Sequence, residues 1–112
     1  MGWTSMTDEV ERLSGIGYWE WDVTNQQINW SRQTRRIFDV AEDALVTLAD
    51  MPRLRPASND GLEARVIRRA LKTGESWEIE HPAQTMTGRQ FTLHSIGHAV
   101  QKDGHTVRII GI

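Results

Sequence analysis

Four histidines are the first residues to consider, because an imidazole can bind a metal ion or transfer a proton. They are His81, His94, His98 and His105. His94 and His98 have the H-x3-H spacing that suits metal binding on a helix, but the surrounding residues favour a strand. Four strand residues span about 13 Å, too far for two nitrogens to share a zinc ion at about 2.1 Å each. We therefore predict no metal site and interpret the histidines as sheet or turn residues.

Carboxylates and hydroxyls give no stronger indication of catalysis. Glu78 and Glu80 fall on one face of a predicted strand, about 6–7 Å apart, where paired acids can do acid–base work but usually form a solvated face. Ser95 has no evident base beside it, and no Gly-x-Ser-x-Gly elbow occurs. The chain contains no cysteine, which excludes disulfides and thiolate nucleophiles. We predict no catalytic residues and do not expect an enzyme.

The bulk properties describe one ordinary globular domain. The chain has 112 residues, 38% of them hydrophobic, with a formal net charge of −2. Acids and bases are mixed along the sequence, so nucleic acid is not an expected partner. No apolar run approaches the roughly 20 residues that a membrane span needs, and no signal peptide is recognisable at the start. These observations, with the missing cysteine, lead us to expect a cytoplasmic protein without a membrane segment.

The elements that must position these side chains begin with a hairpin. In the stretch GIGYWEWDVTNQQINWS, Trp19, Trp21 and Val23 alternate with polar residues. The alternation resumes at Ile28 and Trp30 after the turn residues TNQQ. Period two with aromatic enrichment predicts two short strands with one buried face. The tryptophans are therefore expected to cover one face of a sheet.

Helices are predicted before and after this hairpin. Apolar residues at helical spacing predict short helices over residues 6–13, 32–40 and 41–51, with Ser31 as a helix N-cap. Residues 52–59 are expected to form a loop. The clearest helix covers 60–74, with Asp60 as N-cap and Gly74 at a left-handed C-terminal position.

Period two returns after residue 75. Strands are predicted within 76–85, 90–100 and 105–112, joined by turns at TGR and QKDG. Two strands, a helical middle and three further strands predict an α+β fold: one antiparallel sheet with helices on one face.

The order of these elements resembles the Per-Arnt-Sim (PAS) domain. The opening stretch resembles the G-x-W-x-W-D and W-S words of the PAS subgroup common in bacterial sensory proteins. The stretch ALKTGESWEIEHPAQTMTGRQFTLHSIGHAVQKDGHTVRIIGI resembles its closing half. The resemblance covers residues 15–112, taken as the PAS domain, and leaves 1–14 as an N-terminal flanking helix. It implies a five-stranded antiparallel sheet with short helices and one longer helix against one face.

Two places depart from the subgroup's pattern. Its usual His-Pro-Asp stretch before the long helix is replaced by LRPASND, and Asp39 stands where a glycine often ends the first short helix. The chain also stops at Ile112, where members of the family continue into a linker helix. This predicts a module with its output domain in cis, C-terminal to residue 112.

The resemblance also bears on cofactors. Haem-binding PAS domains use a histidine on the long helix, and residues 60–73 contain none, so haem is not expected. Light-oxygen-voltage photosensors and photoactive yellow protein need a reactive cysteine, so covalent flavin and cysteine-linked chromophores are excluded. Our expectation is that no cofactor is evident, although non-covalent flavin stays open.

The resemblance implies a sensory module of bacterial signal transduction, with a histidine kinase or a cyclic-dinucleotide enzyme as output. An apolar cavity between sheet and helices is expected to bind a small molecule or to respond to a partner. Its predicted ligand-binding residues are Ile37, Phe38, Val66, Ile67, Leu71, Ile79, His81, Leu93 and Ser95. The alternative is a ligand-free PAS scaffold that dimerises its parent protein. In either case we expect a homodimer through the N-terminal helix and the outer sheet face.

Overall fold

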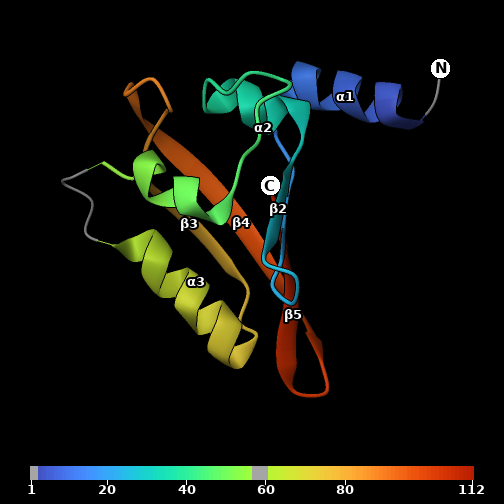
Figure 1. The fold of residues 1–112 in the computed structure, drawn as a ribbon, viewed down its shortest axis with the longest axis vertical. Helices are drawn as coiled ribbons and strands as arrows, with labels where there is room; N and C mark the ends of the chain where they lie inside the picture. The colour runs from blue at the N-terminus through green and yellow to red at the C-terminus, as the bar shows by residue number, and fades with distance from the viewer. Residues whose placement is uncertain (1–2, 57–60) are drawn as a thin grey trace.

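The computed structural model describes residues 3–56 and 61–112, and its centre is a single five-stranded antiparallel sheet (Figure 1). The strands are β1 (Trp19–Asp22), β2 (Gln27–Trp30), β3 (Trp77–Gln84), β4 (Gln90–Lys102) and β5 (His105–Gly111), in the spatial order β2-β1-β5-β4-β3. The early hairpin and the three late strands thus join in one sheet. The predicted fold class and the predicted strands are confirmed.

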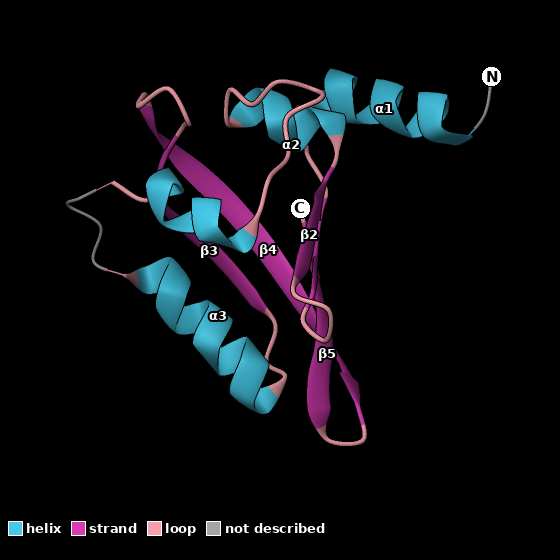
Figure 2. Cartoon of the chain, in the orientation of Figure 1, coloured by secondary structure: helices cyan, strands magenta, loops and turns pink. Residues whose placement is uncertain are grey.

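Helices in the middle of the chain cover one face of this sheet (Figure 2). They are α2 (Arg32–Ile37), the 3-10 helix η1 (Leu48–Leu54) and α3 (Leu62–Thr73). Two groups of buried residues lie beneath them. One centres on Ala70, Trp77, Ala99 and Ile109, and the other on Phe38, Leu54 and Ala83.

Helix ends follow the predicted signals where the structure describes them. The Ser31 hydroxyl accepts a hydrogen bond from the Thr34 backbone N–H at the start of α2. Gly74 adopts φ 79° after α3 and donates its N–H to the Ala70 carbonyl, as the left-handed cap requires. The predicted N-cap Asp60 lies outside the described residues, and Gly61 occupies the cap position instead.

The helix predicted over 41–51 is wrong. Residues 41–47 form turns and irregular structure, and the 3-10 helix starts only at Leu48, continuing through Pro52 into the predicted loop. The Arg35 guanidinium donates hydrogen bonds to the carbonyls of Ala41 and Ala44. A capping box between Thr47 and Asp50 then sets the start of the 3-10 helix.

The N-terminal helix α1 (Trp3–Ser14) is longer than the predicted 6–13 and projects beyond the sheet, touching α2 (Figure 1). Its apolar stripe is exposed: 57% for Met6, 64% for Val10 and 74% for Leu13. In the described part of the chain, no helix is both long enough and apolar enough to cross a membrane.

Candidate functional site

A row of five residues crosses all strands of the sheet, and we call it the glycine row. Trp30 pairs with Trp19, Trp19 with Gly111, Gly111 with Gly97, and Gly97 with Trp77. A Cβ atom added to Gly97 would lie 2.2 Å from the Trp77 ring, and one added to Gly111 would lie 2.3 Å from the Trp19 ring. Glycine at both positions therefore lets indole rings lie directly on the sheet.

Two of the row's three indoles, Trp19 and Trp77, reach each other across the glycines. Trp19 comes from β1 and Trp77 from β3, with β5 and β4 between them, and their rings stack with centroids 6.0 Å apart and planes at 26°. The buried Trp77 indole also donates its Nε1–H to the Ser95 hydroxyl at 3.3 Å. The stack thus spans the centre of the sheet without a side chain beneath it.

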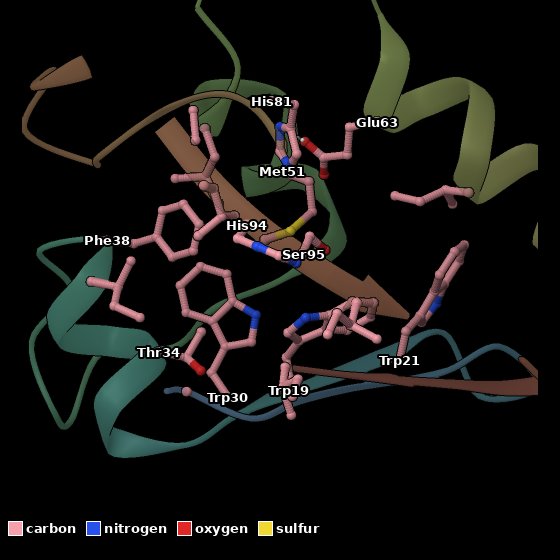
Figure 3. A pocket seen from close by; sticks show the side chains of 18 of the residues that line it. Trp19, Trp21, Trp30, Thr34, Phe38, Met51, Glu63, His81, His94 and Ser95 are labelled. Carbon is pink, nitrogen blue, oxygen red and sulfur yellow. Dashed lines mark ion pairs between the residues drawn. The ribbon is translucent and has the colours of Figure 1, made fainter. Parts of the chain in front are cut away.

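Between this sheet face and the helices lies a cavity of about 700 Å³, which Figure 3 shows from close by. This volume lies within the range of about 300–1,000 Å³ that is usual for small-molecule binding sites. Aromatic residues make up much of its wall: Trp19, Trp21, Trp30, Phe38 and Trp77.

The α2 side of the cavity is also aromatic. The ring centroids of Trp30 and Phe38 lie 5.0 Å apart. The Phe38 and Phe91 rings meet edge-on, with centroids 5.7 Å apart. The Met86 N–H donates to the Phe38 carbonyl at 2.9 Å and ties the end of α2 to the β3–β4 hairpin. The Thr34 hydroxyl lines the cavity but already donates to the Tyr18 carbonyl at 2.8 Å. This wall therefore offers flat apolar surface rather than free polar groups.

Polar side chains gather at another part of the wall, which we call the polar corner: Arg55, Glu63 and His81. His81 is only 2% exposed. Its Nδ1 lies 3.0 Å from the Pro82 carbonyl oxygen and 3.6 Å from Oε2 of Glu63, which is itself 3.9 Å from Nε of Arg55. Nε2 of His81 and Nε of Arg55 are buried without a hydrogen-bond partner among the described residues.

The structure brings six of the nine predicted site residues to the cavity wall: Ile37, Phe38, Ile67, His81, Leu93 and Ser95. Val66, Leu71 and Ile79 are not among its lining residues. They pack instead against the core group around Ala70 and Ile109. The structure therefore places Val66 and Leu71 of α3 and Ile79 of β3 in the core instead of the predicted cavity wall.

Sequence reasoning missed several wall residues. We predicted that the tryptophans cover one face of the sheet. The same alternation indicates which face the helices cover, and so it is the signal for the tryptophans of the wall. No sequence pattern indicated Arg55 or Glu63, because they come from η1's end and α3 and meet His81 only in the folded chain.

The other candidate chemistry lies outside the cavity's polar corner. His94 Nε2 lies 2.8 Å from Oε2 of Glu78 and its Nδ1 lies 3.8 Å from Oε1 of Glu80, in an exposed cluster. His98 Nδ1 is hydrogen-bonded to the Ser76 hydroxyl at 3.0 Å. Within residues 3–56 and 61–112, no group of three or more His, Asp or Glu side chains could hold a metal ion.

Comparison with known proteins gives no match to a family model and none to a curated protein. Solved structures do match. A sensory box histidine kinase/response regulator from Burkholderia thailandensis has a TM-score of 0.71 at 19% identity, over 94% of this chain and 79% of that one. The N-terminal domain of a diguanylate cyclase with PAS/PAC sensor from Marinobacter aquaeolei has a TM-score of 0.69 at 15% identity, over 85% and 89%.

A light-oxygen-voltage (LOV) domain studied with a flavin analogue also matches, with a TM-score of 0.71 at 16% identity, over 92% of this chain and 78% of that one. The shared architecture is an α+β domain with helices on one face of a five-stranded antiparallel sheet. The particular fold is the PAS fold, as the sequence resemblance predicted.

The LOV match corrects the cofactor prediction. We expected no evident cofactor, and this is wrong because the structures that share this fold include several LOV domains, a class that binds flavin non-covalently. The chain's lack of cysteine still excludes a flavin–cysteine bond. An aromatic cavity with a buried imidazole nitrogen that the described residues leave without a hydrogen bond fits a flat ring system with polar edges.

Proposed function

We propose that this chain is a sensory PAS module of a bacterial signalling protein, and that it binds a flat heteroaromatic molecule non-covalently. The observation that carries the proposal is the cavity of about 700 Å³ with tryptophan and phenylalanine walls. Flat apolar walls bury a planar ring on both faces, and a few polar groups orient it. The isoalloxazine ring of a flavin is the first candidate, and a bound flavin would supply a chromophore and a redox centre.

The residues of the glycine row would couple such a ligand to output. Trp19 lies over Gly111 of β5, and Trp77 lies over Gly97 of β4. A ligand against these indoles favours one arrangement of the stack, and thereby one position of β5, the last strand. Occupancy then shifts the population of two β5 positions. An output domain in cis, a histidine kinase or a cyclase as in two of the matching proteins, would respond to that shift.

Binding of lumiflavin, the trimethyl isoalloxazine without a ribityl chain, tests this proposal. Titration followed by flavin fluorescence is expected to show saturable one-to-one binding and a raised melting temperature. Leu93→Trp, which fills the cavity from β4, is the matched variant and should abolish both effects while the domain stays folded by circular dichroism. Absence of binding by the parent domain, or equal binding by the filled variant, would contradict the proposal.

Self-association is a second candidate function, favoured by the exposed stripe of α1. Met6, Val10 and Leu13 form an exposed apolar face on a helix that projects from the domain. On the outer sheet face, Ile96 and Ile112 are exposed to 38% and 47% and border a shallow hollow. Two copies could bury both surfaces in a homodimer.

Light scattering after gel filtration measures this association. Leu13→Asp is expected to shift the domain toward monomer, whereas Glu9→Gln on the same helix should leave the mass unchanged. A monomeric parent domain at high micromolar concentration would exclude the homodimer.

A further inference from the structure

The polar corner contains a hydrogen-bonding atom that the described part of the chain does not satisfy. His81 is 2% exposed, lines the cavity, and its Nε2 is buried without a partner in residues 3–56 and 61–112. Figure 3 shows the imidazole at the cavity wall beside Glu63 and Met51. A buried polar atom without a hydrogen bond costs free energy, and native structures contain few of them. A ligand in the cavity is the natural partner for this nitrogen.

The surroundings of the other ring nitrogen determine what Nε2 can do. Nδ1 lies 3.0 Å from the Pro82 carbonyl oxygen and 3.6 Å from a carboxylate oxygen of Glu63. Both groups accept hydrogen bonds and neither donates, so the proton of the neutral imidazole belongs on Nδ1. Nε2 then carries a lone pair and acts as an acceptor.

Glu63 holds this arrangement from the side of α3. Its carboxylate lies between the His81 ring and the Arg55 guanidinium, 3.9 Å from Nε of Arg55. The carboxylate orients the imidazole, and the guanidinium supplies the opposing charge. The corner is therefore balanced in charge and does not require an anionic or cationic ligand.

From this geometry we infer that the cavity selects heteroaromatic rings that present an N–H or O–H donor at one edge, and that His81 Nε2 accepts that hydrogen bond. The inference rests on the proposed function, because it assumes that a flat ring occupies the cavity. It adds the orientation of the ligand in the cavity: the donor edge of the ring faces the polar corner, and the ring faces lie against the aromatic wall. A site built to accept a hydrogen bond discriminates strongly against an analogue that lacks the donor.

A matched pair of probes separates the donor from the ring. Oxidised lumiflavin has a single N–H, at N3, and 3-methyllumiflavin replaces that hydrogen with a methyl group. The parent domain is expected to bind lumiflavin at least tenfold more tightly, measured by fluorescence titration. His81→Phe keeps a flat ring of similar size but has no acceptor, so the preference should fall to about twofold or less. His81→Gln retains an acceptor oxygen and should keep part of the preference for lumiflavin.

The outcomes are distinguishable. If the preference arose from the bulk of the methyl group alone, it would persist in His81→Phe, and the role of His81 would be overturned. Equal binding of the two probes by the parent domain would overturn it as well, while leaving the proposed function intact. Failure of the parent domain to bind either probe would count against the proposed function itself. Circular dichroism of each variant checks that the comparison is made between folded domains.

Discussion

The glycine row and the polar corner line the same cavity but differ in how their polar atoms are satisfied. In the row, the Trp77 indole N–H is hydrogen-bonded to Ser95 and the ring is stacked on Trp19. In the corner, His81 and Arg55 each bury a nitrogen without a partner among the described residues. Packing in the row stabilises the fold, whereas the unused hydrogen-bonding capacity in the corner is suited to ligand recognition. Substitutions in the two regions should therefore affect different properties.

Trp77→Ala is expected to have the largest effect on stability. It removes an indole that is 8% exposed, its stack with Trp19 and its hydrogen bond to Ser95. Large-to-small changes at buried aromatic residues cost about 3–5 kcal/mol, a large share of the about 5–15 kcal/mol that stabilises a typical domain. Chemical denaturation gives the free energy of unfolding. Leu45→Ala, at a residue 84% exposed, is the control and should change it little.

Gly97→Ala should be the next most damaging change. The added Cβ would lie 2.2 Å from the Trp77 ring, so the indole must move away from the sheet and from Trp19. Overpacking of this kind costs about 1–3 kcal/mol. Thermal and denaturant unfolding measure the cost, and Thr92→Ala on the exposed face of the same strand is the control. An unchanged unfolding midpoint for Gly97→Ala would show that the row is not tightly packed.

His81→Phe tests the other side of the comparison in the ligand-free domain. The change loses the hydrogen bond between Nδ1 and the Pro82 carbonyl, but it also removes a buried nitrogen that no described residue hydrogen-bonds. These effects oppose each other, so the free energy of unfolding is expected to change by less than about 1 kcal/mol. A loss comparable with that of Trp77→Ala would mean that the polar corner is structural, like the glycine row.

Asp39 is expected to make a smaller, pH-dependent contribution to the free energy of unfolding. It lies at the surface, where the end of α2 meets the β3–β4 hairpin. A hydrogen bond from the Thr87 hydroxyl at 2.9 Å is the main reason that the pKa of Asp39 lies below its ordinary value, with further contributions from Thr85 and Arg89. Because the folded pKa is depressed, this stabilisation is present above the unfolded pKa of about 3.9 and is lost as the pH falls through the folded value.

Unfolding measured between pH 7 and pH 2 checks this contribution. Asp39→Asn removes the charge but tolerates the left-handed φ of 57° at this position, so it should flatten the acid limb of the stability curve. Thr87→Val, which removes the hydroxyl donor, should flatten it in the same direction. An acid limb identical to that of the parent domain in both variants would contradict the assignment.

The sequence predicted the elements whose signals are local. Alternation in the tryptophan hairpin and in the three late strands reproduces the observed sheet, and Ser31 and Gly74 cap their helices as predicted. The prediction of a helix over 41–51 was wrong because a side chain outside the segment, that of Arg35, donates hydrogen bonds to the carbonyls of Ala41 and Ala44. Asp39 stands where the PAS subgroup often has a glycine, and its backbone adopts the positive φ of 57° that favours glycine.

For the site, the sequence indicated four apolar wall residues, Ile37, Phe38, Ile67 and Leu93, and two polar ones, His81 and Ser95. It assigned Val66, Leu71 and Ile79 to the wall because periodicity shows which face of an element is buried, but not what that face meets. Arg55 and Glu63 were not predicted to line the site, because charged residues on a helix and its flank look solvated in sequence.

By itself, the sequence determined the buried faces, the strand and helix order, and the exclusion of cysteine chemistry, because these depend on residue type and near-neighbour spacing. Only the tertiary structure decided that Gly97 and Gly111 would pair across two strands, leaving room for Trp19 and Trp77 to stack above them. It also decided that Glu63 would lie beside one ring nitrogen of His81, while the other has no hydrogen-bond partner among the described residues. Both arrangements join residues from distant parts of the chain, so they depend on strand register and helix docking, which no local pattern encodes.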